Sequence, residues 1–173
     1  MLKRLFGGGR DIGIDLGTAN TLVYVRDKGI IINESTVVAV NNKTDQILAV
    51  GYEAKNMLGK TPPHITVTRP LLGGIVSDYE VTEKMLKYFI DKVYDGHVSV
   101  MNRPRIVVSV PLEVTEVEIK AVEDAATAAG AKEVFIVQEP MAAAIGARMP
   151  IKDPVGNMIV DIGGEIQRLL LYL

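Results

Sequence analysis

The sequence contains no cysteine and no tryptophan, and only two of its 173 residues are histidines. Without cysteine there can be no disulfide, no thiolate metal site and no cysteine nucleophile. The two histidines, His64 and His97, lie far apart in the sequence, and a histidine metal site usually needs several convergent ligands. We therefore expect neither histidine to bind a metal or to act as a general base.

A strong charge of one sign and long apolar runs are also absent. The formal net charge is −2 at pH 7, so no basic field indicates a nucleic-acid partner. No apolar run reaches the roughly 18 residues of a membrane-spanning helix, and the apolar part of the N-terminal stretch MLKRLFGGGRD is too short for a signal peptide. With 48% hydrophobic and 23% charged residues, the composition is that of a globular domain or two small subdomains.

Alternating apolar stretches and turns predict strands at about 11–15, 20–26, 29–33 and 36–41, with a hairpin turn at Asp27-Lys28-Gly29. The stretch NNKTDQILAVG predicts a further turn and strand. The next segment, up to about residue 77, mixes a short helix with loops, because prolines and glycines interrupt any longer element. We interpret this segment as a small inserted subdomain.

Helical patterns then alternate with apolar strands. VTEKMLKYFIDKVYDG has one apolar face, and EVTEVEIKAVEDAATAAGA carries a capping box at Thr115 and Glu118 and a stop at Gly130. The stretches PRIVVSVP, KEVFIVQ and NMIVDIGG have the pattern of buried strands. EPMAAAIGAR predicts a short helix with Pro140 in its first turn. The order of these elements predicts an α/β layered fold with a mixed sheet.

The turn between the first two predicted strands has the composition of a phosphate-binding loop. Gly17 has no Cβ, so the backbone can approach a ligand closely. Successive N–H groups and the hydroxyls of Thr18 and Thr21 can converge on phosphate oxygens. Asp15, at the end of the strand, can hold the waters of a Mg²⁺ ion. The alternative is a simple polar hairpin.

A second stretch repeats this layout. VDIGG at 160–164 is again an apolar strand, an aspartate (Asp161) and a glycine turn, which suggests a nucleotide clamped between two similar loops. Glu139 follows a buried strand and precedes a helix that starts with proline, so its carboxylate could orient a water for attack on a γ-phosphate. The alternative for Glu139 is a helix N-terminal charge favoured by the helix dipole.

Together these stretches resemble a known family. DIGIDLGTANTLVYV, AVGYEAKNMLGKTP, VTEKMLKYFI, QEPMAAAIGA and MIVDIGG are similar, in order from about residue 10 to residue 164, to the N-terminal half of MreB, the family of bacterial actin homologues. Hsp70 chaperones, sugar kinases and the cell-division protein FtsA share the D-x-G-T pattern but not GTANT together with EPMAAAIGA. A fragment of a sugar-kinase or chaperone ATPase is therefore the weaker alternative.

The resemblance implies an actin/Hsp70-type ATPase fold with two lobes around ATP and Mg²⁺, of which this chain would cover the first. Residues 1–32 and 78–160 would form one subdomain with the first phosphate loop, and 33–77 the small inserted α+β subdomain. Residues 161–173 would begin the second phosphate loop and continue as an aberrant tail.

The resemblance also assigns roles to single residues. Glu139 and Asp161 would be catalytic, with Glu139 positioning the hydrolytic water. Asp15 and Asp161 would hold Mg²⁺ through water. The residues that would bind the nucleotide are Asp15, Gly17, Thr18, Ala19, Asn20 and Thr21 in the first loop, and Gly163 and Gly164 in the second.

Members of the family form filaments on the inner face of the cell membrane, maintain rod shape and organise cell-wall synthesis. The resemblance thus implies a cytoplasmic, peripherally membrane-associated protein whose partners are its own copies, the membrane surface, and shape-determining and wall-synthesis proteins. The start of the chain, MLKRLF, combines Leu2, Leu5 and Phe6 with two basic residues, as in short amphipathic segments that lie on anionic bilayers. A frayed terminus is the alternative.

The end of the sequence departs from the family pattern. Glu165 follows Gly164 where the family has a third glycine and then hydroxyl residues, and a carboxylate at that place would repel phosphate. Since the second lobe is also missing, we expect that this chain alone binds ATP and Mg²⁺ weakly or not at all and does not hydrolyse ATP. A permitted back-translation of the tail, read after restoring one G to a run of glycine codons, gives a family-like continuation, so we expect a frameshift. The alternatives are a naturally split or truncated homologue, and in function a non-catalytic remnant that caps or poisons filaments of an intact homologue.

Overall fold

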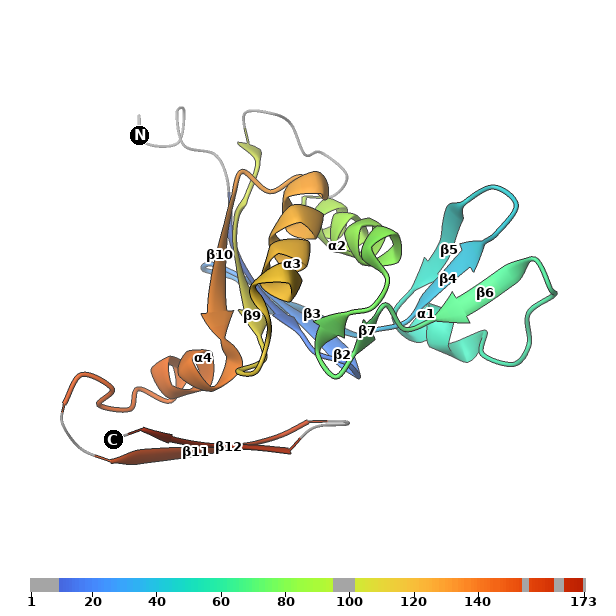
Figure 1. The fold of residues 1–173 in the computed structure, drawn as a ribbon. Coiled ribbons are helices and arrows are strands. Elements are labelled where there is room, and N and C mark those ends of the chain that lie inside the picture. Colours follow the sequence, from blue (N-terminus) through green and yellow to red (C-terminus); the bar gives the residue numbers. More distant parts are fainter. Residues whose placement is uncertain (1–9, 95–101, 154–155, 164–166, 173) are drawn as a thin grey trace.

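The computed structural model describes residues 10–94, 102–153, 156–163 and 167–172. Figure 1 shows a central sheet with two helices on one face, a smaller sheet to one side, and a two-stranded ribbon beside the short helix α4. Among the described residues, no helix is long and apolar enough to cross a bilayer.

The central sheet has five strands in the order β10-β9-β1-β2-β3. β1, β2 and β3 form an antiparallel meander, whereas β1, β9 and β10 run parallel. Short turns join the antiparallel strands and helices join the parallel ones, as these two geometries require. The mixed sheet predicted from the sequence is confirmed. The bounds are β1 Asp11–Leu16, β2 Asn20–Val25, β3 Gly29–Ser35, β9 Arg105–Val110 and β10 Glu133–Gln138.

Two helices, α2 (Tyr79–Val93) and α3 (Glu116–Ala128), cover one face of this sheet. At the start of α2, the Asp78 side chain accepts a hydrogen bond from the backbone N–H of Val81. At the start of α3, Thr115 and Glu118 form both hydrogen bonds of a capping box, so that prediction is confirmed. Each of these two caps satisfies backbone N–H groups that have no partner inside the helix.

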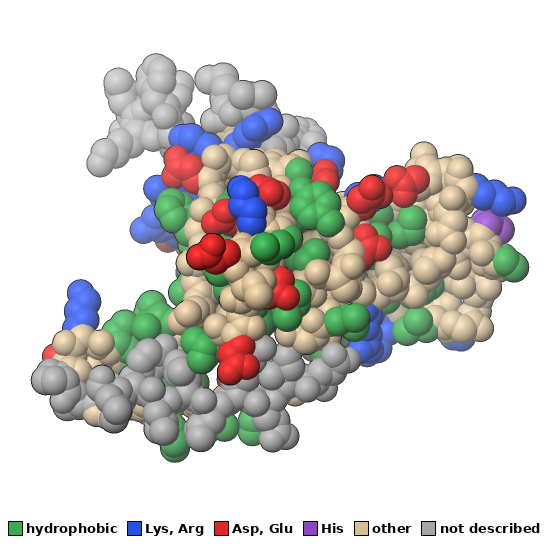
Figure 2. All heavy atoms as spheres, viewed as in Figure 1, with side chains coloured by type: hydrophobic (Ala, Val, Ile, Leu, Met, Phe, Trp, Pro, Cys, Tyr) green, Lys and Arg blue, Asp and Glu red, His purple; other side chains and the backbone are tan. Residues whose placement is uncertain are grey.

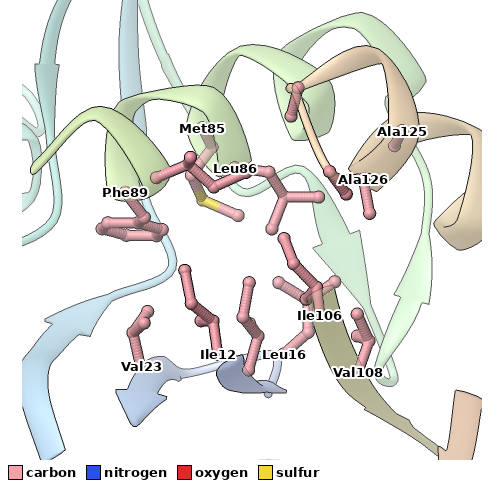
Figure 3. Close-up of a cluster of buried hydrophobic side chains, with 14 of the residues drawn as sticks. Ile12, Leu16, Val23, Met85, Leu86, Phe89, Ile106, Val108, Ala125 and Ala126 are labelled. Carbon is pink, nitrogen blue, oxygen red and sulfur yellow. The ribbon is translucent and has the colours of Figure 1, made fainter. Parts of the chain in front are cut away.

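The hydrophobic core lies between this face and the two helices. Figure 3 shows side chains of β1, β2 and β9 directed toward Met85, Leu86 and Phe89 of α2 and toward the alanines of α3. In β1, alternate side chains are buried while the intervening ones lie on the opposite face, because successive side chains of a strand point to opposite sides. Asp15 is one of those on the opposite face, so burial of the core positions it away from the helices.

The inserted subdomain is a three-stranded antiparallel sheet in the order β5-β4-β6, with α1 (Tyr52–Asn56) beside it. The strands are β4 Val38–Asn41, β5 Gln46–Val50 and β6 Ile65–Thr68. It has its own small core of Val37, Ala39, Ala49 and Ala54. The sequence predicted loops where β6 lies, because four residues after two prolines, three of them half-buried and one exposed, give too weak a strand pattern.

Two further strand pairs complete the fold. The two-residue strands β7 (Leu71–Leu72) and β8 (Ile75–Val76) form a tight hairpin around Gly73 and Gly74, whose φ angles are 59° and 77°. β11 (Asn157–Ile162) pairs antiparallel with β12 (Gln167–Tyr172) and, among the described residues, with no other strand.

Two boundaries differ from those drawn on the sequence. β3 continues to Ser35, so residues 33–35 lie in the central sheet, beyond the boundary predicted at 32. β11 includes residues 157–160, which the prediction assigned to the first subdomain, but it belongs to the separate ribbon. The helix α4 (Glu139–Gly146) connects β10 with the segment that leads to β11.

Candidate functional site

The first predicted phosphate loop closes the β1–β2 hairpin. In the register of the hairpin, Leu16 lies opposite Thr21, so the residues between them form the turn. A Cβ built on Gly17 would lie 2.7 Å from the backbone oxygen of Asn20, a contact that real side chains do not make. Gly17 is therefore required by the closure of the loop itself, a reason that the sequence analysis did not give.

The two threonines of the loop face the protein. Thr21 is fully buried, and its hydroxyl lies 2.9 Å from that of Thr36. Thr18 is 7% exposed, and its Oγ1 accepts a hydrogen bond of 2.6 Å from the N–H of Gly74. The expectation that both hydroxyls face a phosphate is thus corrected for Thr21, which stabilises the loop from beneath. Thr18 retains its own hydroxyl hydrogen for a further acceptor.

Asp15 lies at the end of β1, on the face of the sheet opposite the helices. Its Oδ1 accepts a hydrogen bond of 2.9 Å from Ser109 Oγ, and Ser109 is the partner of Asp15 in the parallel pairing of β1 with β9. Ser109 is nearly buried, and its hydrogen bond restrains one oxygen of the otherwise exposed Asp15 carboxylate. No local pattern in the sequence marks Ser109, because its pairing with Asp15 joins residues 94 positions apart.

Glu139 is the first residue of α4 and is half-buried. The preceding residue, Gln138, makes no side-chain cap on the helix. A Cβ built on Gly74 would lie 3.8 Å from Glu139 Oε1 and 2.6 Å from Pro111 Cγ. The glycine turn between β7 and β8 therefore reaches both Thr18 of the first loop and Glu139, and only a glycine fits there.

One cavity of about 630 Å³ joins the three carboxylates that the sequence singled out. Asp15, Glu139 and Asp161 all line it, together with Ser109. Asp161 comes from the ribbon strand β11, so the cavity lies between the central sheet, α4 and the ribbon. The rest of its wall is mainly apolar, formed by residues that include Leu22, Tyr24, Ile30, Val107, Val137 and Ile159.

The carboxylates do not form a direct metal cage. Within the part of the chain that the structure describes, no group of three or more His, Cys, Asp or Glu residues is close enough to hold a metal ion. Mg²⁺ usually keeps several waters and is bound through one or two carboxylates plus phosphate oxygens. The donor set of Asp15 and Asp161 suits that indirect mode and does not suit a dedicated all-protein site.

For the remaining predicted site and membrane residues, the structure gives little or no placement. Gly163 is exposed just after β11, whereas Gly164 and Glu165 lie outside the described residues. The predicted membrane residues Leu2, Leu5 and Phe6 lie outside them as well.

The charged face of α3 lies apart from this cavity. Lys120 forms ion pairs there with Glu123 and Asp124. Figure 2 shows acidic side chains gathered over the region of α3 with basic ones among them. We interpret this face as a solvated surface.

Comparison with known proteins gives a consistent result. The family model described as MreB/Mbl protein matches residues 9–169. The cell shape-determining protein Mbl of Bacillus cereus is 52% identical over 155 residues, which cover 90% of this chain and 46% of that protein. The chain therefore spans about half the length of the curated relatives it matches.

Solved structures agree in fold. The crystal structure of MreB5 of Spiroplasma citri bound to ADP matches with a TM-score of 0.82 and 36% identity, over 94% of this chain and 48% of that one. The MamK double helical filament matches with a TM-score of 0.76 over 92% of this chain and 49% of the MamK chain, at 20% identity, which shows the fold alone. The chain thus has the architecture of one lobe of the actin fold, as predicted.

Proposed function

This chain belongs to the MreB/Mbl family, and from that premise we propose that it is the nucleotide-binding first lobe of an actin-like cytoskeletal protein that determines cell shape. The observation that carries the proposal is the cavity that Asp15, Glu139 and Asp161 all line, although they come from β1, α4 and β11.

The residues fit a nucleoside triphosphate with Mg²⁺. The turn at Gly17 admits no Cβ, and successive backbone N–H groups in such a turn suit an anion. Asp15, oriented by Ser109, and Asp161 would hold the waters of the Mg²⁺ ion. The ion would neutralise phosphate charge when bound. Glu139 would accept a hydrogen bond from a water and orient it.

The larger-scale function follows from the relatives. Mbl of Bacillus cereus is named for determining cell shape. We propose that the whole protein assembles into filaments on the inner face of the membrane, maintains rod shape and organises wall synthesis with membrane partners. Copies of the same chain and the membrane surface are then its main partners, and the cytoplasm its compartment.

Binding of Mg·ATP to the purified 173-residue chain tests the nucleotide site. Isothermal titration should show weak binding that Gly17→Ala weakens at least tenfold further, because the added methyl group would collide with the backbone oxygen of Asn20. A tenfold loss corresponds to about 1.4 kcal/mol. Gly146→Ala is the matched control, since a Cβ there meets nothing within 4 Å. We expect it to bind as the unaltered chain does.

Two results would count against the proposal. Equal affinity of Gly17→Ala and the unaltered chain would show that the loop does not contact the nucleotide. No binding by the unaltered chain, combined with slower assembly of an intact homologue when the chain is added, would favour the capping or poisoning role instead.

A further inference from the structure

Thr36 lies beneath the first phosphate loop and contacts it at three points. It is fully buried. Its hydroxyl donates to the backbone oxygen of Gly17 at 2.6 Å, and its N–H donates to the oxygen of Ala19 at 3.0 Å. Its single hydroxyl hydrogen is thereby used, so the 2.9 Å contact with Thr21 must have Thr21 as donor. One side chain and one amide thus bind three residues of the loop.

Thr36 also lies at the junction between the central sheet and the inserted subdomain. At Ser35, the end of β3, the chain leaves the central sheet, and Val37 is already part of the core of the inserted subdomain. The N–H of Gly51 donates to the oxygen of Val37 at 2.9 Å. Thr36 is therefore the residue at which the chain passes from one subdomain to the other, and it is bound to the loop at that point.

Glu34 connects the same junction to the inserted subdomain from its other side. Its Oε2 accepts a hydrogen bond of 3.0 Å from the N–H of Tyr52 at the start of α1, and its Oε1 lies 3.3 Å from Lys92 Nζ of α2. A Cβ on Gly51 would lie only 2.3 Å from Glu34 Oε2, and Gly51 has a φ of 77°. The hydrogen bond between the start of α1 and Glu34 therefore requires glycine at position 51.

We propose that Thr36 is a positioning residue that couples the phosphate loop to the inserted subdomain, so that a change in the packing of either one alters the other. Its value for ligand binding rests on the nucleotide site proposed above. The coupling itself is a property of the chain without ligand and can be measured separately.

Hydrogen exchange of the nucleotide-free chain, followed by mass spectrometry, tests the hydroxyl. Thr36→Val keeps the shape and removes the hydrogen bonds of the side chain, so exchange in peptides covering 17–21 and 38–50 should become roughly tenfold faster. Thr36→Ser keeps the hydroxyl and should stay within about twofold of the unaltered chain. Ser35→Ala is the matched control, because the buried hydroxyl of Ser35 has no hydrogen-bond partner, and we expect it to leave the loop unchanged.

A second pair of variants tests the coupling from the far side. Gly51→Ala would displace the side chain of Glu34, whose backbone is the register partner of Thr21, and the proposal expects faster exchange at 17–21. Gly59→Ala is its control, since Gly59 has a similar φ of 71° but nothing within 4 Å of a Cβ. It should perturb only its own turn.

The outcomes separate clearly. The proposal is overturned if Thr36→Val leaves the loop unchanged, if Thr36→Ser exchanges as fast as Thr36→Val, or if Gly51→Ala loosens the inserted subdomain alone. If Thr36→Val unfolds the whole chain, the Gly51 and Gly59 pair still decides. Failure of Mg·ATP binding in the titration would remove the proposed function and would leave this exchange result standing.

Discussion

Asp11 shows how one side chain can join three strands at the end of the sheet away from the cavity. It lies on β1, and its carboxylate pairs with Arg105 of β9 at 2.7 Å and with Arg26, just after β2, at 2.6 Å. Hydrogen bonds from Arg105 and then from Arg26 hold the pKa of Asp11 below its ordinary value of 3.8. The ionised form is therefore favoured more in the folded chain than in the unfolded one.

The lowered pKa predicts a specific dependence of stability on pH. The contribution of Asp11 is fully present above its unfolded pKa and is lost as the pH falls through the lower folded pKa. Asp11→Asn should reduce the free energy of unfolding at neutral pH by about 0.5–2 kcal/mol, since two partly exposed ion pairs are lost. Urea unfolding at neutral pH and at about pH 3 checks this. If the difference in free energy of unfolding between the unaltered chain and Asp11→Asn stayed constant over this range, the assignment to Asp11 would be contradicted.

Single residues differ in how far a local sequence pattern marks them as candidates for the site. Asp15, Glu139 and Asp161 could be picked out because each carries its own local pattern, a strand followed by a turn or a helix. Ser109, Thr36 and Gly74 carry no such pattern. They matter through hydrogen bonds to the loop or to Asp15 from distant parts of the chain, and contacts of this kind leave no mark in the spacing of residues.

Among the elements, the central sheet has one face covered by α2 and α3, while its other face borders the cavity and is partly exposed. At one level of the sheet, Ile30, Tyr24, Gly13, Val107 and Phe135 are neighbours across all five strands. Four of these are large apolar side chains, and each is more than 40% exposed. An apolar row of this length favours association, because contiguous exposed apolar surface is unusual on a soluble monomer.

This row predicts a concentration-dependent self-association of the isolated chain that a charge on the sheet would suppress. Phe135 is 51% exposed and does not line the cavity, so Phe135→Lys should reduce association severalfold without unfolding. Leu48→Lys, at a leucine of β5 that is 44% exposed, is the control and should change association little. Sedimentation velocity over a range of concentrations measures both. Equal association of the two variants would mean that the row is not the contact.

The helices illustrate why element prediction worked well. The capping box of α3 and the aspartate cap of α2 are local in sequence, and so are the apolar faces that both helices bury. The short strands β6, β7 and β8 were not predicted as strands. Each has two to four residues, and such short segments form only because a neighbouring strand supplies their hydrogen bonds.

For the assembled protein, the proposed membrane attachment rests on the start of the sequence. Leu2, Leu5 and Phe6 give an amphipathic segment with two basic residues, and a segment this short binds weakly as a single copy. Repetition along a filament would multiply its effect. Attachment is thus expected to depend on assembly as well as on the segment itself.

Flotation with lipid vesicles tests this attachment. The chain should float with vesicles that contain anionic lipid more than with zwitterionic ones, and added salt should weaken binding. Replacing Leu5 and Phe6 together by serine should lower the bound fraction severalfold. Leu58→Ser, at an exposed leucine of the inserted subdomain, is the control. Binding that is the same for both vesicle types, or for both variants, would remove the N-terminal segment from the proposal.

The sequence by itself determined the identity of most elements, the mixed α/β class and the family, and it predicts Asp15, Glu139 and Asp161 as the carboxylates of the candidate site. Those conclusions depend on local periodicity, on capping and turn residues, and on motifs that are contiguous in the chain. The tertiary structure alone decided the strand order β10-β9-β1-β2-β3, the separate ribbon of β11 with β12, and the inward orientation of Thr21. It also brought Thr36 beneath the loop and Ser109 beside Asp15. These features depend on which distant segments pair and on which side chains the core buries, and such choices are made only when the whole chain packs together.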